Sequence, residues 1–119
     1  MLLLDANAIL RFILQDNNKM ADKVEAVLAE NNCIVTLEVL AEIVYVLQKV
    51  YQLSRKKIAE KIREITNLNL VFESEVVLYS ADLFSSTKLD FVDCLLAGYS
   101  KVIGHDVFTF DKELNKHLA

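Results

Sequence analysis

The sequence predicts an α/β domain in which a short parallel sheet is flanked by helices. Short apolar or β-branched runs recur along the chain, and segments with helical spacing of apolar residues separate them. Strands separated by helices pair in parallel, with helices on both faces of the sheet. The chain has no proline and only two glycines, which argues against an all-β sandwich. Its 119 residues fit one domain, spanning residues 1–119.

Four segments are expected to be strands. Residues 2–4 are wholly apolar and end at Asp5, which favours a strand buried on both faces of the sheet. Residues 33–35, 68–72 and 107–110 are the other three candidates. In parallel sheets, ligand sites lie beyond the carboxyl ends of the strands, so the residues that directly follow these segments are the first candidates for a site.

Helices are expected between the strands. Apolar residues recur at helical spacing over residues 8–13 and 21–28, and Thr36 is placed to cap a helix that runs to about residue 51. Further helices are expected over residues 74–86, 90–101 and 111–118. Ser54 begins another helix, with isoleucines facing the core and these basic side chains facing outward: Arg55, Lys56, Lys57, Lys61 and Arg63.

Charge and apolar patterning narrow the class of protein. A net charge of −4 argues against a simple electrostatic nucleic-acid binder, but a nuclease that reaches nucleic acid through metal cations is compatible with it. Asp5 interrupts the N-terminal apolar run, so no signal peptide is expected, and no apolar run is long enough to span a membrane. Cys33 and Cys94 are then expected to be reduced thiols, and the protein cytoplasmic.

Four acidic residues occupy positions where apolar or uncharged residues are more common. Asp5 and Asp111 directly follow predicted strands, although each also fits as the N-cap of a following helix. Glu42 lies in a segment that is apolar around nearly its whole circumference, so we expect it to be buried and paired with a metal ion or a lysine. Asp93 precedes an apolar run, and with Asp90 it also matches a capping box.

Convergence of these acids would imply a cation. Like charges in one small volume do not all stay ionised without a counter-charge, and carboxylate oxygens suit Mg²⁺ or Mn²⁺. The positions after strands and on apolar helices favour convergence, but the spacing alone leaves it open.

Four segments, taken in order, resemble the acidic motifs of PIN domains, and in particular those of the virulence-associated protein C (VapC) toxins. They are residues 3–11, which read LLDANAILR, and residues 40–44, 90–97 and 108–114, which read LAEIV, DFVDCLLA and FTFDKEL. The resemblance extends over the whole chain. It implies a PIN-like fold with a short central parallel sheet of four or five strands flanked by helices.

The resemblance also implies an activity, namely metal-dependent cleavage of RNA. The catalytic and metal-binding acids would be Asp5, Glu42, Asp93 and Asp111, with Mg²⁺ or Mn²⁺ as the cofactor. Supporting roles would fall to Asn7, Thr109 and Asp90. Two departures from the pattern are Ala6, where many relatives carry a hydroxyl, and Cys94, where a small alanine is common.

The resemblance to toxins further implies a homodimer and a small antitoxin partner. The mean hydropathy of +0.30 gives independent support for an interface, because surface that stays apolar usually marks one. The candidate faces also fit as core: Ile9, Phe12 and Ile13 in one segment, and Val77, Leu78 and Phe84 in another.

Two other functions fit part of the pattern. Asp5 after a first strand would suit an enzyme that forms an aspartyl phosphate, but Asn7 replaces the acid expected two positions later and the chain lacks room for a cap domain. A non-catalytic PIN-like binding or scaffolding module is the second alternative. Its mark would be the loss of one or more of the four acids, and all four are present.

Overall fold

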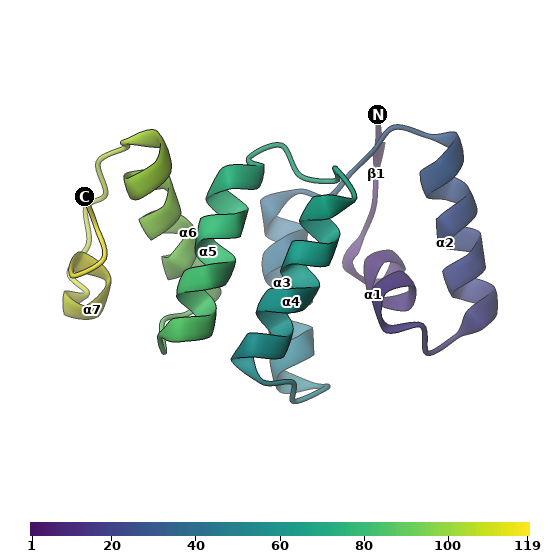
Figure 1. The fold of residues 1–119 in the computed structure, drawn as a ribbon, viewed down its shortest axis with the longest axis horizontal. Coiled ribbons are helices and arrows are strands. Elements are labelled where there is room, and N and C mark those ends of the chain that lie inside the picture. The colour runs from purple at the N-terminus through teal and green to yellow at the C-terminus, as the bar shows by residue number, and fades with distance from the viewer.

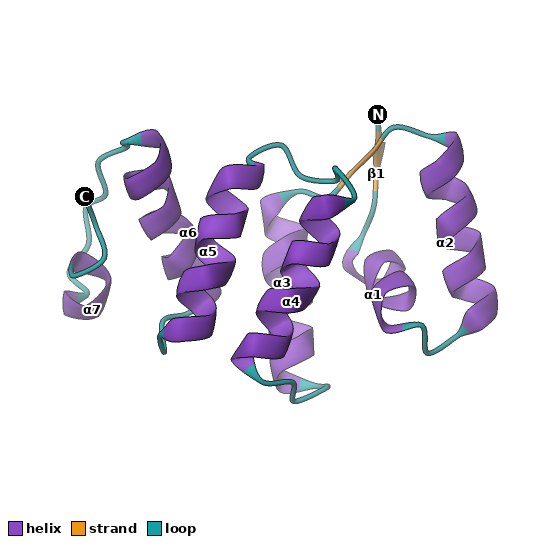
Figure 2. Cartoon of the chain, viewed as in Figure 1, coloured by secondary structure: helices purple, strands orange, loops and turns teal.

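The computed structural model describes residues 1–119 and is mostly helical, with one small parallel sheet (Figure 1, Figure 2). Most of the helices stand side by side, and the first helix lies across them, in a molecule of 45 × 30 × 18 Å. None of them has the length and apolar composition needed to cross a bilayer. The elements are, in order, β1 (Leu2–Leu3), α1 (Ala6–Leu14), α2 (Asn18–Glu30), β2 (Cys33–Ile34), α3 (Leu37–Lys49), α4 (Arg55–Asn67), α5 (Ser74–Ser86), α6 (Phe91–Gly98), the π-helical turn η1 (Tyr99–Ile103) and α7 (Lys112–Asn115).

Side-chain caps begin most of the helices at the predicted places. The Thr36 hydroxyl accepts a hydrogen bond from the Val39 amide at 3.3 Å, and the Ser54 hydroxyl accepts one from the Lys57 amide at 3.1 Å. Each cap satisfies one of the amides that the first turn of a helix leaves without a backbone partner. The predicted starts of α3 and α4 are thus confirmed.

The sheet is smaller than the sequence predicts. β1 and β2 pair in parallel, with Leu2 opposite Cys33 and Leu3 opposite Ile34. Of the two other expected strands, the segment 68–72 contributes one bond, from the Val35 amide to the Leu70 carbonyl at 2.7 Å, and residues 107–110 have no backbone partner. The α/β class stands, but four or five strands are not observed, because an extended segment becomes a strand only where a neighbour supplies its hydrogen bonds.

The core lies between the helices rather than on the sheet. α4 packs against α5 and α5 against α6, while α1 packs against α2 and α3. Leu3 is largely exposed, so the expectation that residues 2–4 are buried on both faces is wrong for β1. Both candidate interface faces are mostly core: Ile9, Ile13, Val77 and Phe84 are buried.

A small residue allows α5 and α6 to approach closely. A Cβ atom on Gly98 would lie 2.9 Å from the Ser80 hydroxyl and 3.0 Å from the Val76 carbonyl oxygen. The buried Ser80 hydroxyl lies 2.7 Å from that carbonyl and 3.0 Å from the Cys94 carbonyl oxygen, so it joins the two helices. This contact sets the position of α6 on the rest of the core.

Arg55 joins the start of α4 to the end of α5 and to the segment before α6. Its guanidinium donates to the Phe84 carbonyl at 2.7 Å and to the Leu89 carbonyl, and it lies 3.7 Å from the centre of the Phe84 ring. The expectation that Arg55 faces solvent is therefore wrong. The planar guanidinium of Arg55 binds two carbonyls and stacks on an aromatic ring, whereas the neighbouring Lys56 and Lys57 are exposed.

Replacing Arg55 by methionine tests this junction. Methionine keeps an apolar stem but leaves the Phe84 and Leu89 carbonyls without a donor, so we expect a loss of about 1–3 kcal/mol in the free energy of unfolding. Urea denaturation measures it. Lys56→Met is the matched control at an exposed neighbouring position and should change stability by less than about 0.5 kcal/mol. Equal effects of the two variants would show that the Arg55 contacts contribute little.

Candidate functional site

An acidic pocket lies between the segment that leads into α6 and the helix α7. Its volume is about 500 Å³, and its lining is polar except for one leucine. Four of the eight lining residues carry carboxylates, so the pocket is the main concentration of negative charge around a hollow of the molecule. The lining consists of Thr87, Lys88, Leu89, Asp90, Asp93, Asp111, Glu113 and His117.

Asp90 and Asp93 enter the pocket from the start of α6. Asp90 occupies the N-cap position with an extended backbone, but its side chain accepts no capping hydrogen bond. The capping-box interpretation of this pair is therefore wrong, and both carboxylates remain available to the pocket. Arg55 holds the carbonyl of Leu89, which directly precedes Asp90. The site is thus attached to the core by the same junction that joins α4 to α5.

Asp111 reaches the pocket from the start of α7. One of its carboxylate oxygens accepts hydrogen bonds from the Glu113 amide at 2.9 Å and the Leu114 amide at 3.1 Å, so the N-cap interpretation is confirmed. The Thr109 hydroxyl accepts a bond from the Asp111 amide at 3.0 Å and steadies its backbone. Leu114 is buried and attaches α7 to α6.

The pocket raises the pKa of Asp93. Burial is the largest cause, and the nearby charges of Asp111 and Asp90 act in the same direction, because each disfavours the ionised carboxylate. None of these three acids forms an ion pair. The basic groups on the lining, Lys88 and His117, are also without an acidic partner. The pocket therefore carries uncompensated negative charge beside two free basic side chains.

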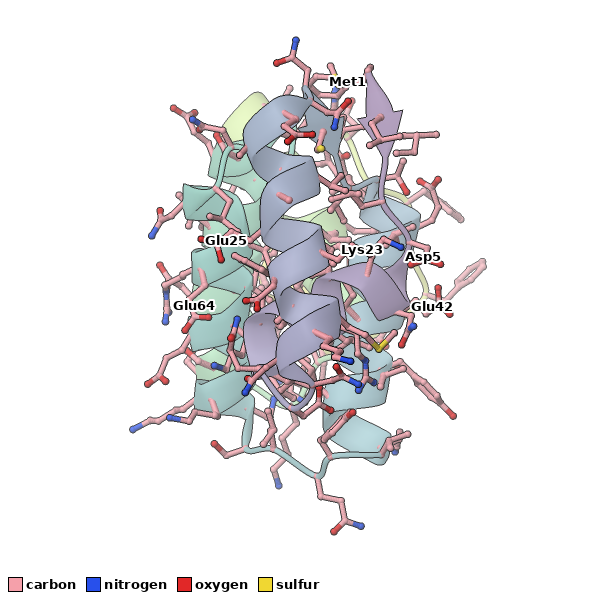
Figure 3. All side chains as sticks on the ribbon, turned by 90° about the vertical axis from the view of Figure 1, so that its right-hand side faces the viewer. Met1, Asp5, Lys23, Glu25, Glu42 and Glu64 are labelled. Atoms are coloured by element: carbon pink, nitrogen blue, oxygen red, sulfur yellow. The ribbon has the colours of Figure 1, made fainter.

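Asp5 and Glu42 lie on other elements. Asp5 follows β1 and caps α1, accepting a bond from the Ala8 amide at 2.9 Å. Glu42 lies on α3 and is exposed, so the expectation of a buried Glu42 is wrong: the core face of α3 is formed by other residues, and the opposite face is open to solvent. α1 packs against α3, and Figure 3 shows Asp5 and Glu42 on the same side of the molecule. Asn7 is exposed in the first turn of α1.

The four acids do not gather into one closed centre. Asp93 and Asp111 share the pocket, whereas Asp5 and Glu42 do not line it. No three histidine, cysteine, aspartate or glutamate side chains come close enough to hold a metal ion together. Residues 107–110, which precede Asp111, pair with neither strand of the sheet, so the sheet does not bring Asp111 beside Asp5. The carboxylates suit Mg²⁺ in their chemistry, but their placement does not form a ready site for one ion.

A second groove leads to the same acids from the other side. It has a volume of about 410 Å³, and Asp90 and Asp93 form part of its lining. α3 provides Tyr45, Gln48 and Lys49 to the opposite wall. Asp93 thus borders a hollow on its α7 side and another on its α3 side.

Sequence reasoning missed three residues of the pocket: Lys88, Glu113 and His117. A signal was present for two of them, because Glu113 and His117 are four residues apart directly behind Asp111, the spacing that places side chains on one helix face. Lys88 carried no signal beyond its closeness in sequence to Asp90. Its place in the pocket depends on the path of the chain between α5 and α6.

Comparison with known families places this acidic site in context. The family model described as the PIN domain matches residues 2–117, which is nearly the whole chain. Comparison with curated proteins and with solved structures gives no match. PIN domains are commonly nucleases, which agrees with a pocket rich in carboxylates. The chain belongs to the PIN-domain family.

Proposed function

We propose that this protein is an endoribonuclease that requires Mg²⁺ or Mn²⁺ and hydrolyses phosphodiester bonds of RNA at the acidic pocket. The observation that carries the proposal is the pocket itself, where Asp90, Asp93 and Asp111 are unpaired by any base. Membership of a family whose members are commonly nucleases supports it. Asp93 is half-buried beside two other acids and its pKa is raised, and a perturbed carboxylate in a recess is typical of functional sites.

The roles of the side chains follow from their chemistry. Lys88 offers positive charge and His117 offers a ring N–H to the phosphate of the substrate, which the acidic lining would otherwise repel. Asp93 is the group best suited to take a proton from the attacking water, because a raised pKa makes a carboxylate a stronger base. Burial first, and then the charges of Asp111 and Asp90, keep that pKa raised, and Thr109 orients Asp111 through its hydrogen bond from the Asp111 amide.

The proposed role of the cation is to neutralise negative charge between the pocket and RNA. RNA and the pocket are both negative, and a hard divalent cation is the partner that carboxylate oxygens prefer. No three acids meet around one point, so the side chains do not fix a position for the cation. Asp5 at the start of α1 and Glu42 on α3 lie outside the pocket, and we propose them as ligands, with Asn7 in support, on the resemblance to VapC toxins alone.

Nuclease activity should depend on the cation and on Asp93. We expect the purified protein to cleave single-stranded RNA with Mg²⁺ or Mn²⁺, to lose activity in EDTA, and to lose about 100-fold or more with Asp93→Asn. The resemblance to VapC toxins makes Asp5 a ligand of the cation, so Asp5→Asn should also be inactive; it should stay folded, because asparagine keeps the N-cap of α1. A fluorescent RNA measures the rates.

The control for this experiment is Asp22→Asn, which removes an exposed, unpaired acid from α2. It should cleave like the parent. Cleavage that persists in EDTA, or equally in the Asp93→Asn protein, would assign the activity to a contaminant or to a different mechanism.

Stability should depend on pH through Asp93. Its folded pKa lies above the unfolded value of about 3.9, so ionisation of Asp93 costs stability. The cost is absent below the unfolded pKa and develops as the pH rises through the folded pKa. We therefore expect Asp93→Asn to melt at a higher temperature than the parent at pH 7, with a difference that shrinks toward pH 4. Calorimetry at both values checks this, and a difference independent of pH would contradict it.

The proposed biological role is that of a toxin with a small antitoxin, and the proposed assembly is a homodimer. The resemblance to VapC toxins motivates both, and an antitoxin with a basic residue would complement the acidic pocket.

Expression of the parent should arrest growth, expression of the Asp93→Asn variant should not, and co-expression of a cognate antitoxin should restore growth. Colony counts measure all three. If the parent and the Asp93→Asn variant arrested growth equally, the toxicity would not depend on the acidic pocket.

A further inference from the structure

β1 has an open edge. The amides of Leu2 and Leu4 donate to the carbonyls of Asn32 and Ile34, at 2.7 and 3.0 Å, so these groups face β2. Successive peptide groups along a strand point to opposite sides, and those of Leu3 therefore point away from β2. No third strand lies there. The other edge of the sheet is covered, because the Val35 amide donates to the Leu70 carbonyl.

The open edge adjoins apolar surface. The Leu3 side chain is 66% exposed, and it lines a groove of about 400 Å³ together with Phe72 and Tyr99. Ten residues line this groove, and seven of them are hydrophobic. Unpaired strand edges beside exposed apolar side chains favour the addition of a further strand.

The segment 107–110 has the complementary properties. Its sequence, Val-Phe-Thr-Phe, consists of residues that favour strands. Val107 and Thr109 are half-buried, while Phe108 and Phe110 are 87% and 90% exposed, which is the alternation of a strand with one face open. The two phenyl rings contact each other edge to face at 5.3 Å. None of the four residues makes a backbone–backbone hydrogen bond.

The segment is held away from β1 of its own chain. On one side, the Gly104 amide bonds back to η1. On the other, the buried Leu114 fastens α7 to α6, and the Ala119 amide donates to the Ser100 hydroxyl at 2.9 Å. Figure 1 shows β1 and this C-terminal region on opposite sides of α5 and α6. Reaching its own β1 would require the segment to detach α7, whereas a second molecule meets it as it stands.

We propose that a second copy of the chain provides the missing strand: residues 107–110 of each molecule add to the open edge of β1 in the other. The exchange is reciprocal, so each strand edge is paired and the assembly closes as a dimer. The exposed phenyl rings are placed to cover the apolar groove beside Leu3. The inference deepens the homodimer proposed above, and it does not depend on the nuclease activity.

Oligomeric state is the first test. Light scattering on the full chain should give a dimer at micromolar concentration, and Phe108→Ser combined with Phe110→Ser should give a monomer with unchanged circular dichroism and a cooperative melting transition. Tyr45→Ser removes an exposed aromatic ring from α3, far from both surfaces in sequence, and should remain a dimer. A parent monomer would overturn both the exchange and the homodimer. A double variant that stays dimeric would overturn the exchange alone.

Cross-linking identifies which chain provides the strand. Two differently tagged chains, one with Leu3→Cys and one with Thr109→Cys, are co-expressed with Cys33→Ala in both, because Cys33 lies beside β1. Mild oxidation should yield a disulfide between the two tags, and Glu60→Cys on α4 in place of Thr109→Cys should yield none. A single chain with both Leu3→Cys and Thr109→Cys should cross-link between molecules. A disulfide formed within one monomer would show that the segment pairs with its own β1 and would overturn the proposal.

Discussion

The Arg55 junction is the interaction on which the placement of the site depends. One guanidinium binds the carbonyl of Phe84 near the end of α5 and the carbonyl of Leu89 just before α6, while its flat face covers the Phe84 ring. Burial lowers the pKa of Arg55, and the nearby Cys94 and Asp90 act in the opposite direction. The charge is therefore kept in a partly desolvated place because it satisfies two carbonyls at once. Leu89 directly precedes Asp90, the N-cap of α6. The contact between Arg55 and Leu89 therefore helps to fix the positions of Asp90 and Asp93.

Helix α6 is packed closely against the core, yet its first turn carries an acid whose ionisation burial opposes. Gly98 and Ser80 bring the helix close to α5, and Cys94 is fully buried against the core. Burial raises the pKa of the Cys94 thiol to about 11, so it stays protonated and unreactive next to Asp93. The first turn of the same helix nevertheless carries Asp93, where the helix dipole favours an acid but burial and neighbouring acids oppose ionisation. The polar side chains that the pocket offers for chemistry are thus mainly carboxylates, a lysine and a histidine.

The sheet positions residues more than it stabilises the fold. Most of the buried side chains belong to helix–helix contacts, whereas β1 and β2 are only two residues each. The pairing of these strands nevertheless sets where Asp5 emerges and where α1 begins. In a two-stranded sheet each strand has an outer edge, and only the outer edge on the β2 side has a hydrogen-bond partner. A carbonyl from the segment before α5 covers the edge of β2, and that of β1 stays open beside apolar side chains.

Local features of this protein could be predicted from the sequence, and features that depend on distant partners could not. The caps at Thr36, Ser54 and Asp111 and the bounds of α5 follow from residues within a few positions of each other. The motif order likewise indicated the family that the family model matches.

The tertiary structure alone decided which apolar helix face stayed open, and so Glu42 is exposed rather than buried. It also decided that Arg55 turns inward, that Lys88 and His117 join the acidic pocket, and that residues 107–110 remain unpaired. The physical reason is the same in each case. Helix caps and helical periodicity are interactions between near neighbours, whereas burial, strand pairing and the meeting of charges depend on where segments far apart in the chain are brought together.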